Sequence, residues 1–466
     1  GSRLMHMLRR WLGDEAFAKG LNAYFAKHQY GNTIGRDLWN ALGAASGRDV
    51  AAFMDSWLEQ PGYPVLTAIV ENDTLKISQK QFFVGEKEEK DRLWVVPLNS
   101  NWTGIPDTLE TETLEIPNYT ALAAQNEGAL RLNTENTAHY ITDYQGELLD
   151  NILATITDLD NTSKLQVVQE RRLLAEAGFV SFADLIPVVE RLTNETSYLV
   201  VSAVKAVLNS LKTFVDEGTE TEVAFKKLLV KLNQANFDRL GFEAKAGETD
   251  EDELVRQIVV ANMIAADDEK ASQKASQIFE AYHDTLEKLP AATRLQILIN
   301  QIKRHETKEL TDKYLAKYIT TVDGNFQRQL ASALSYTKNE TTLTHLLEEW
   351  KNKDIVKPQD LAMSWYFTFL QHDFTQGTVW TWARENWDWI KAALGGDMSF
   401  DKFVIYPAST FKTHERLAEY KAFFEPQLSD LAISRNISMG IKEICARIDL
   451  IDKEKAAVEA AIKATV

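Results

Sequence analysis

The chain has 466 residues, and its 68 acidic and 51 basic side chains give a formal net charge of −17. This acidic balance argues against a nucleic-acid partner, because nucleic-acid affinity depends on Lys and Arg side chains that neutralise phosphates. No apolar run approaches the roughly 18 residues of a membrane span. The single cysteine, Cys445, excludes an intrachain disulfide and any metal site built from several cysteines.

Residues 1–62 predict a group of helices. Apolar residues recur every four positions at Phe17, Leu21 and Phe25, behind Asp14 as an N-cap. We expect the helices to end within Gln60–Pro64, where two prolines and a glycine prevent a helix from continuing. This is the clearest domain boundary in the sequence.

Residues 63–145 have a different pattern of apolar and polar residues from the helices before them. Turn signals such as Asn72-Asp73 separate short runs that are apolar or alternate between apolar and polar residues. The runs are Val65–Val70, Leu75–Ile77, Leu93–Leu98, Leu114–Ile116, Ala129–Leu132 and Tyr140–Ile141. Regularly spaced short strands of this kind predict a small antiparallel β-sandwich.

Residues 146–466 have the pattern of many successive amphipathic helices. Leu254, Ile258, Ala261 and Ile264, for example, recur at the helical period and share one face. Helices joined by short links, each burying its apolar face against the next, predict an α-solenoid. The predicted fold class is therefore mainly α with a small all-β domain.

The search for catalytic motifs is negative. A zinc-peptidase helix requires His-Glu-x-x-His, because residues at i and i+4 share a helix face and can bind one ion. Two segments approach this motif, but the one at His305 ends in Glu309 and the one at His414 ends in Ala418. Cys445 lies in an apolar-periodic segment, which is typical of a buried structural cysteine. These motifs by themselves indicate an acidic scaffold.

Six segments carry a more specific pattern. They are the helix at residues 1–17, the segment Trp57–Pro64, the strand Leu93–Leu98 together with Leu132–Tyr144, and the C-terminal segments Trp380–Asp388 and Ser434–Ile441. Together they resemble the zinc-dependent aminopeptidase N family (alanyl or lysyl aminopeptidases, gluzincins), in its bacterial cytosolic type. Ala138 and Ile141 stand where the family commonly has Gly and Arg, so no role is carried over to those two positions.

The resemblance implies a three-part layout. Residues 1–62 would be the C-terminal helices of a thermolysin-like catalytic domain, 63–145 a β-sandwich, and 146–466 a superhelical α-helical domain. In that family zinc is held by His-Glu-x-x-His and a downstream Glu, and a Gly-Ala-Met-Glu-Asn loop binds the substrate amine. This sequence contains neither. We therefore expect a C-terminal fragment that is inactive alone and has no catalytic residue, metal or cofactor of its own.

The resemblance also implies a function for the parent protein. It would be a zinc metallo-aminopeptidase of the cytoplasm that removes N-terminal residues from peptides, and its partners would be peptide substrates and the remaining N-terminal part of the same protein. The helical domain would shape and close the substrate chamber. A basic side chain there would bind the carboxyl end of the peptide, for which Arg is suited by its bidentate fork. The candidates for this substrate-binding role are Arg435 and Arg384.

Three alternatives stay open. The chain could be a non-enzymatic α-solenoid interaction scaffold, since solenoids present concave binding surfaces, or a catalytically dead homologue. A secreted glycoprotein ectodomain is the third, because N-x-S/T sequons occur at Asn72, Asn101, Asn118, Asn161, Asn194, Asn339 and Asn436.

Overall fold

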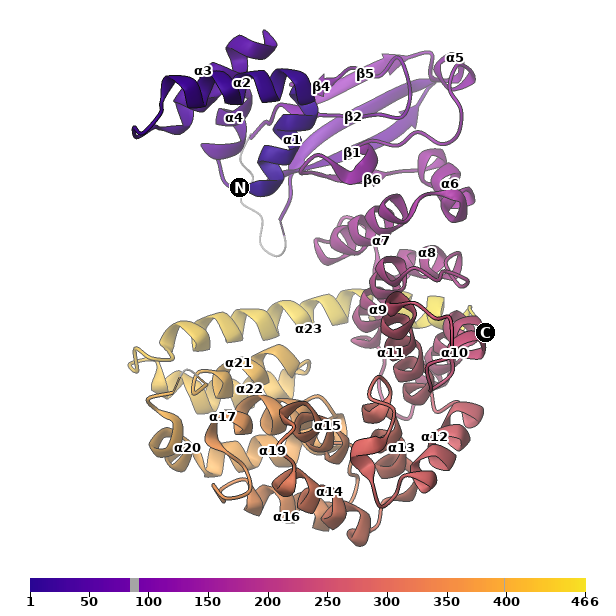
Figure 1. The fold of residues 1–466 in the computed structure, drawn as a ribbon, viewed down its shortest axis with the longest axis vertical. Coiled ribbons are helices and arrows are strands. Elements are labelled where there is room, and N and C mark those ends of the chain that lie inside the picture. The colour runs from indigo at the N-terminus through magenta and orange to yellow at the C-terminus, as the bar shows by residue number, and fades with distance from the viewer. Residues whose placement is uncertain (84–91, 398) are drawn as a thin grey trace. The chain divides into compact units, whose positions relative to one another are not determined.

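The computed structural model describes residues 1–83, 92–397 and 399–466, which form two compact units, Gly1–Leu192 and Thr193–Val466. Figure 1 shows helices along most of the chain and one small region of strands. The predicted mainly helical chain with a small β region is thereby confirmed. The division into 1–62, 63–145 and 146–466 and the sandwich and solenoid architectures stay predictions.

The first unit combines helices and short strands around a shared apolar core. Its helices are α1 (Ser2–Leu12), α2 (Asp14–Lys27), α3 (Gly35–Ser46), α4 (Val50–Leu58), α5 (Tyr119–Ala124), α6 (Glu147–Ala154), α7 (Asn161–Glu176) and α8 (Ile186–Glu190). Its strands are β1 (Pro64–Glu71), β2 (Thr74–Gln81), β3 (Val96–Pro97), β4 (Thr108–Leu109), β5 (Thr113–Pro117) and β6 (Ile141–Tyr144).

The main sheet begins with a tight hairpin. β1 and β2 pair antiparallel as far as Glu71 and Thr74, so Asn72 and Asp73 form the whole turn. Both have positive φ, 49° and 58°, which a two-residue type I′ turn requires and which Asn and Asp adopt more readily than most residues. β5 joins β2 antiparallel and β6 joins β1 parallel, which gives the order β5-β2-β1-β6, while β3 and β4 pair separately.

One predicted strand is wrong. Residues Ala129–Leu132 are irregular, because their polar backbone groups pair with Asn101 instead of a neighbouring strand. The Asn101 amide donates to the Arg131 carbonyl at 3.1 Å, and the Arg131 amide donates to Asn101 Oδ1 at 2.7 Å.

Side chains at the end of α4 join the helices to the strand region. Trp57 Nε1 donates to the Val95 carbonyl at 3.0 Å, and Gln60 Nε2 donates to the Leu93 carbonyl at 2.7 Å. These bonds link the family-like segment Trp57–Pro64 to the family-like strand Leu93–Leu98, so the spacing of the two segments has a structural cause.

The family-like segment Leu132–Tyr144 is likewise held by buried bonds. Asn133 Nδ2 donates to the Ala138 carbonyl at 3.1 Å, and Asn133 Oδ1 accepts from the Ala138 amide at 2.6 Å. Tyr140 donates its hydroxyl hydrogen to the Leu98 carbonyl at 2.7 Å, and Tyr144 Oη accepts from the Leu132 amide at 2.6 Å. These residues therefore determine the local fold of the β region.

A buried carboxyl connects α7 to β6. Glu170, which is 7% exposed, accepts from the Thr142 amide at 3.1 Å and from Gln166 Nε2 at 2.9 Å. Burial raises the pKa of Glu170 to about 8, although both hydrogen bonds and the charge of Arg3 oppose the rise. The folded chain therefore keeps a proton on this carboxyl at a pH where the unfolded chain has lost it.

The second unit is helical, and its apolar core runs from α9 to α23. Its helices are α9 (Tyr198–Lys212), α10 (Glu220–Leu240), α11 (Asp250–Ala265), α12 (Glu269–Ala281), α13 (Arg294–His305), α14 (Lys308–Thr320), α15 (Gly324–Leu334), α16 (Glu340–Glu349), α17 (Pro358–Asp360), a π-helix (Leu361–Phe367), α18 (Thr368–Leu370), α19 (Asp373–Glu385), α20 (Trp387–Leu394), α21 (Lys402–Thr410), α22 (His414–Phe424) and α23 (Ser434–Lys463). Within the described ranges, none of the helices is both long and apolar enough to cross a membrane.

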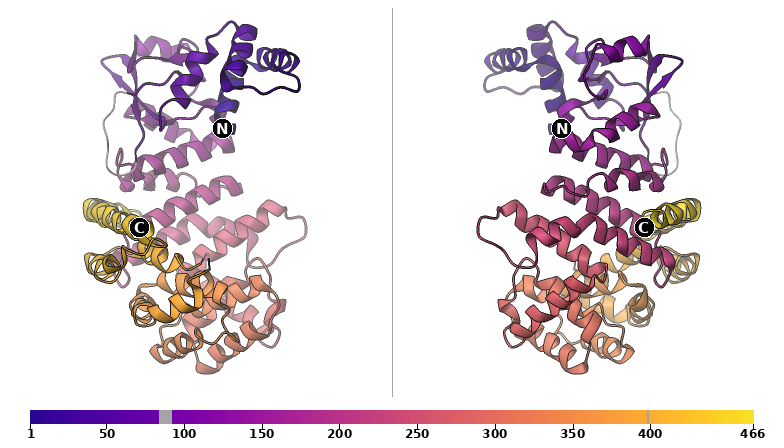
Figure 2. Two further views of the ribbon diagram at one scale, coloured as in Figure 1. Left: turned by 90° about the vertical axis from the view of Figure 1, so that its left-hand side faces the viewer. Right: turned by 90° about the vertical axis from the view of Figure 1, so that its right-hand side faces the viewer.

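The last helix returns to the start of this unit. α23 packs on α21 and α22 and reaches α10 (Figures 1 and 2). Lys455 of α23 pairs with Asp216, and Lys463 lies 3.8 Å from a Glu220 carboxylate oxygen. Gly440 is the point of closest approach, since a Cβ built there would collide with the Tyr420 hydroxyl and lie 2.8 Å from Ala408 Cβ.

The Glu170 carboxyl generates a prediction about pH. Because its folded pKa lies above the unfolded value of 4.5, its contribution to stability is complete below pH 4.5 and is lost as pH rises toward 8. The loss amounts to about 1.4 kcal/mol per pH unit. Glu170→Gln removes this dependence. The unfolding free energy measured with urea is therefore expected to vary less between about pH 5 and pH 8 in the variant than in the parent chain. The exposed Glu127→Gln is the control, and equal pH profiles for the parent and Glu170→Gln would refute the expectation.

Gly440→Ala tests the contact between α23 and its neighbours. We expect it to lower the unfolding free energy by roughly 1–3 kcal/mol, because Tyr420 or the backbone of α21 must shift to admit the methyl group. Gly324→Ala is the matched control at a helical glycine where a Cβ would meet only Arg328 Nη1, at 4.0 Å. Thermal unfolding measures both, and an unchanged midpoint for Gly440→Ala contradicts the close packing.

Candidate functional site

The second unit contains a cavity of about 640 Å³ where several helix ends meet. The C-terminal ends of α9, α11 and α13 and the N-terminal ends of α10 and α19 contribute to its wall, so residues from Lys212 to Lys412 come together. The lining includes the cations Lys212, Lys226, Lys303, Arg304, Lys338 and Lys412 and the acids Glu217, Glu222, Asp267, Glu306 and Asp373.

The helix ends explain why cations gather at this point. Unpaired carbonyls give a helix C-terminus a partial negative charge, which favours Lys and Arg in the last turn. Lys212 ends α9, and Lys303 and Arg304 lie in the last turn of α13. Lys303 Nζ donates to the Ile264 carbonyl in the last turn of α11 at 3.1 Å. Each lysine has a local reason for its place, and packing assembles them into one wall.

Most of these cations have acidic partners. Lys226 lies 2.7 Å from Glu222 and 3.0 Å from Asp267, which also pairs with Lys303. Lys338 pairs with Glu217. These pairs hold the cavity wall together and leave little of their charge available to a ligand.

Lys212 is the cation that remains available, because it forms no hydrogen bond or ion pair with any described residue. Lys412 forms long ion pairs, at 3.6 Å with Asp373 and at 3.8 Å with Asp216. Solvent reaches Lys212 through the cavity, yet the surrounding protein and then Lys412 lower the pKa of its ammonium. The charge of an anion placed here would oppose both effects, because it favours the protonated ammonium.

His372 reports the sign of the potential in the cavity. Burial, followed by the charges of Lys212, Lys303 and Lys338, lowers the pKa of His372 to about 3. The ring is therefore neutral at physiological pH, with Nε2 3.1 Å from Ser335 Oγ. A positive cavity with the unpaired ammonium of Lys212 is suited to bind a carboxylate or a phosphate.

The two arginines predicted to bind substrate lie outside this cavity. Arg384 packs its guanidinium 5.3 Å from the Trp380 ring centre and donates to Thr381 Oγ1 at 3.2 Å, so it is engaged with its own helix. Arg435 lies exposed in the first turn of α23 and forms no hydrogen bond or ion pair with any described residue. No hydrogen bond joins Arg384 to Arg435, and of these two residues Arg435 has the free guanidinium.

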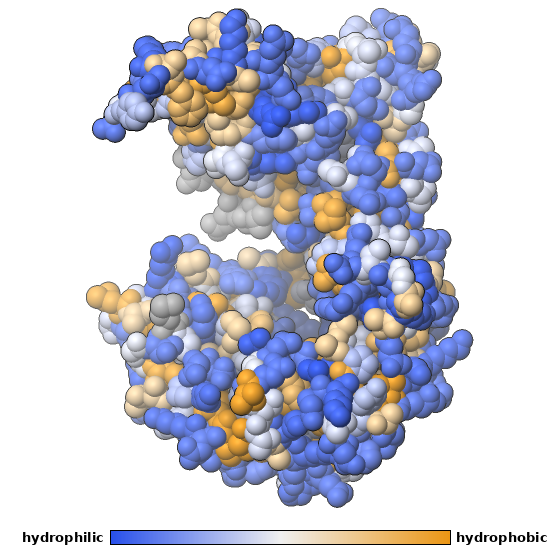
Figure 3. Space-filling view, in the orientation of Figure 1, coloured by the Kyte–Doolittle hydropathy of each residue, from blue (hydrophilic) through white to orange (hydrophobic). Residues whose placement is uncertain are grey.

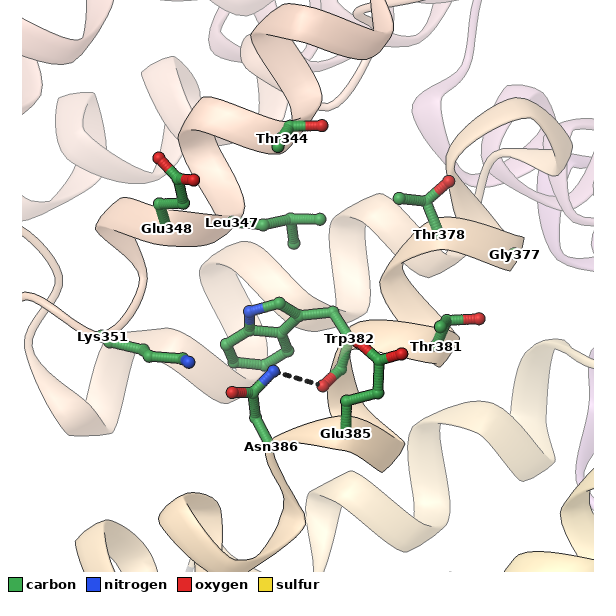
Figure 4. Close-up of a pocket in the computed structure, with 10 residues that line it drawn as sticks. All are labelled: Thr344, Leu347, Glu348, Lys351, Gly377, Thr378, Thr381, Trp382, Glu385 and Asn386. Carbon is green, nitrogen blue, oxygen red and sulfur yellow. Dashed lines mark hydrogen bonds between the residues drawn. The ribbon is translucent and has the colours of Figure 1, made fainter.

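A shallower groove of about 560 Å³ lies beside Arg384, between α16 and α19. Figure 4 shows Leu347 and Trp382 facing each other across it, with Glu348 and Glu385 at its rim. Asn386 Nδ2 donates to the Trp382 carbonyl at 2.8 Å. Thr381, which accepts from Arg384, is part of this rim, so Arg384 supports the groove wall.

Sequence reasoning did not identify the cavity lysines. A lysine at a helix C-terminus is the ordinary way to balance the helix dipole. The available signal was the presence of such lysines at Lys212 and Lys303, and it does not indicate which helix ends meet.

The described residues offer no place for a metal ion. Across residues 1–83, 92–397 and 399–466, no group of three or more His, Cys, Asp or Glu side chains is arranged to hold one. Cys445 is a free, half-buried thiol on α23, more exposed than its apolar surroundings predicted. The zinc implied by the family resemblance therefore does not fit this part of the chain.

Comparison with known proteins covers nearly the whole chain. Residues 130–446 match the ERAP1-like C-terminal domain, and residues 1–57 match the Peptidase family M1 domain. The chain is 59% identical over 464 residues to aminopeptidase N of Lactococcus lactis subsp. lactis, covering 99% of this chain and 54% of that protein. It is 40% identical over 463 residues to aminopeptidase N of Lactobacillus helveticus, with coverages of 99% and 55%.

A more distant relative extends the similarity beyond bacteria. The puromycin-sensitive aminopeptidase of Caenorhabditis elegans is 27% identical over 477 residues, covering 98% of this chain and 50% of that protein. The chain spans about half the length of the curated relatives it matches. With the ERAP1-like domain matching most of its residues and the identity to aminopeptidase N extending along 99% of them, the chain belongs to the M1 aminopeptidase N family.

Proposed function

We propose that the chain is the C-terminal part of a metallo-aminopeptidase that removes N-terminal residues from peptides in the cytoplasm, and that it is inactive by itself. The observation that carries the proposal is the 59% identity to an aminopeptidase N over 99% of the chain. Because the described residues do not fit zinc, the metal would be held elsewhere in the whole protein. The described residues of this chain would then not act as its ligands.

The role of the second unit would be to shape the substrate chamber as a superhelical α-solenoid. Successive helices that pack pairwise, such as α10 on α11 and α12 on α13, support this architecture. The return of α23 to α10 supports a closed rather than an open array.

The first unit would bind the remaining N-terminal part of the protein. Large apolar side chains lie exposed on α2, before α3 and on α4: Phe25 is 63% exposed, Ile34 70% and Leu58 55%. Figure 3 shows an orange area over α2 and α3. Such side chains are typical of a surface that another protein segment covers, and residues 1–57 belong to the part that matches the M1 domain.

The second unit would also bind the carboxyl end of the peptide. Lys212 offers an unpaired ammonium in a positive cavity, and Arg435 offers an unpaired guanidinium. Either can form charge-assisted bonds to a carboxylate. Arg384 is the weaker candidate, because its guanidinium already packs on Trp380.

Reconstitution tests the proposed activity. The chain, mixed with the separately produced upstream portion of its gene product, is expected to hydrolyse an alanyl chromogenic amide in a zinc-dependent manner, while neither part alone does so at a normal rate. Binding of the two parts without turnover would instead support a catalytically dead homologue or a scaffold. A mass shift from glycans in protein from the native source would support the secreted alternative.

The carboxyl-end contact generates a separate prediction for the whole protein. Lys212→Met and Arg435→Ala are each expected to raise KM for longer peptides roughly three- to tenfold, since each removes one charge-assisted bond. KM for a single-residue amide should stay the same, because that substrate has no distant carboxylate. Lys227→Met, which removes an exposed charge from α10, is the control. Equal effects on both substrates would reject the role for that residue.

A further inference from the structure

A second groove crosses the helical unit where α9, α11, α13 and α15 lie next to one another. It has a volume of about 470 Å³ and is lined by the carboxamides Gln257, Gln296, Asn325 and Gln329. α11 contacts α13, and α13 contacts α15, so the carboxamides stand on three successive neighbouring helices. Sequence reasoning did not single out this group.

The four carboxamides share a lack of protein partners, although Gln257 and Asn325 are exposed to solvent and Gln296 and Gln329 are half-buried. None of their side chains forms a hydrogen bond with any described residue, and Gln329 Oε1 is shielded from solvent as well. On the packed faces of the same unit, amides are bonded: Asn262 donates to Asn233 at 3.1 Å, and Asn300 donates to the Ser272 carbonyl at 3.1 Å. A shielded amide oxygen without a donor costs free energy unless a ligand supplies that donor.

The floor of the groove permits a close approach. Ala261, Ala291 and Ala292 are small, and Leu295 and Ile258 complete an apolar base. Lys205 is the single charged residue among the described lining residues, so charge does not select the ligand. The groove therefore presents both hydrogen-bond donors and acceptors over a surface that a main chain can reach.

These properties match one kind of ligand. A carboxamide carries one acceptor and two donor hydrogens, and it complements the C=O and N–H of a peptide group. Packed helices lie about 8–10 Å apart, and an extended chain advances about 3.3 Å per residue, so neighbouring helices meet every third residue. Three helices would thus contact roughly six residues of an extended strand.

We infer that this groove binds an extended stretch of peptide main chain, with Gln257, Gln296, Asn325 and Gln329 pairing to backbone groups. The ligand is read through its backbone, so residues of many types are accepted along it. The inference rests on the proposed function for the identity of the peptide as substrate. The binding itself concerns this chain alone and does not depend on turnover.

The test is direct binding to the 466-residue chain, measured by fluorescence anisotropy of a labelled peptide of roughly ten residues. The double variant Gln257→Met with Gln296→Met is expected to weaken binding about tenfold, as loss of two backbone bonds implies. Gln277→Met, at an exposed position of α12, should leave binding unchanged. Far-UV circular dichroism and the thermal midpoint confirm that each variant is folded.

A second peptide isolates the backbone contribution. The same sequence with alternate amides N-methylated should bind the parent chain about tenfold more weakly than the unmethylated peptide does. The double variant should bind the methylated and the unmethylated peptide with the same affinity. Equal affinity for methylated and unmethylated peptides would overturn the inference. The inference would also be overturned if a saccharide displaced the peptide while the glutamine substitutions left peptide binding unchanged. Because no turnover is measured, failure here differs from failure of the reconstitution.

Discussion

The return of α23 to α10 is the contact on which the helical unit depends. Lys455 of α23 pairs with Asp216, and Asp216 also lies 3.8 Å from Lys412, a residue of the cavity wall. The ion pair that brings the last helix back therefore shares Asp216 with a lysine of the cavity wall. Gly440 allows the same helix to approach Tyr420 and Ala408 without a side chain between them. Together these contacts hold together helix ends that are distant in the sequence, and the cavity exists because those ends meet.

Local charge in this protein differs from total charge. The chain carries a net charge of −17, yet the potential at His372 is positive enough to help lower the pKa of its ring to about 3. The reason is geometric: packing brings lysines from several helices to one wall, and Lys212 forms no ion pair there. Lys212 and Lys303 lie in the last turns of their helices, where a positive charge is favoured. An acidic exterior with a positive cavity would repel anions at long range and retain those that enter. This charge distribution suits a ligand that is held by several contacts better than a ligand that is captured by charge alone.

Three concave sites among the described residues of the helical unit have different chemistry. The cavity at Lys212 presents unpaired positive charge, the groove at Gln257 presents neutral donors and acceptors, and the groove at Trp382 presents an indole between two carboxylates. A peptide has a charged end, a neutral repeating backbone and varied side chains, and the first two features correspond to the first two sites. Under the proposed function, the unit would hold a peptide away from the reacting bond.

The sequence by itself determined the features that depend on neighbouring residues. Asn72 and Asp73 predicted a turn because both tolerate positive φ, the segment Gln60–Pro64 predicted the end of a helix because proline lacks the amide hydrogen, and the Trp57–Pro64 segment carried the family resemblance that the comparisons confirmed. Irregular Ala129–Leu132 was mistaken for a strand, because its partner Asn101 lies 30 residues away. Only the tertiary structure decided the cavity and the carboxamide groove. Lysines and glutamines at helix ends and on helix faces are ordinary in each helix taken alone, and they acquire a function when packing determines which of them face the same space.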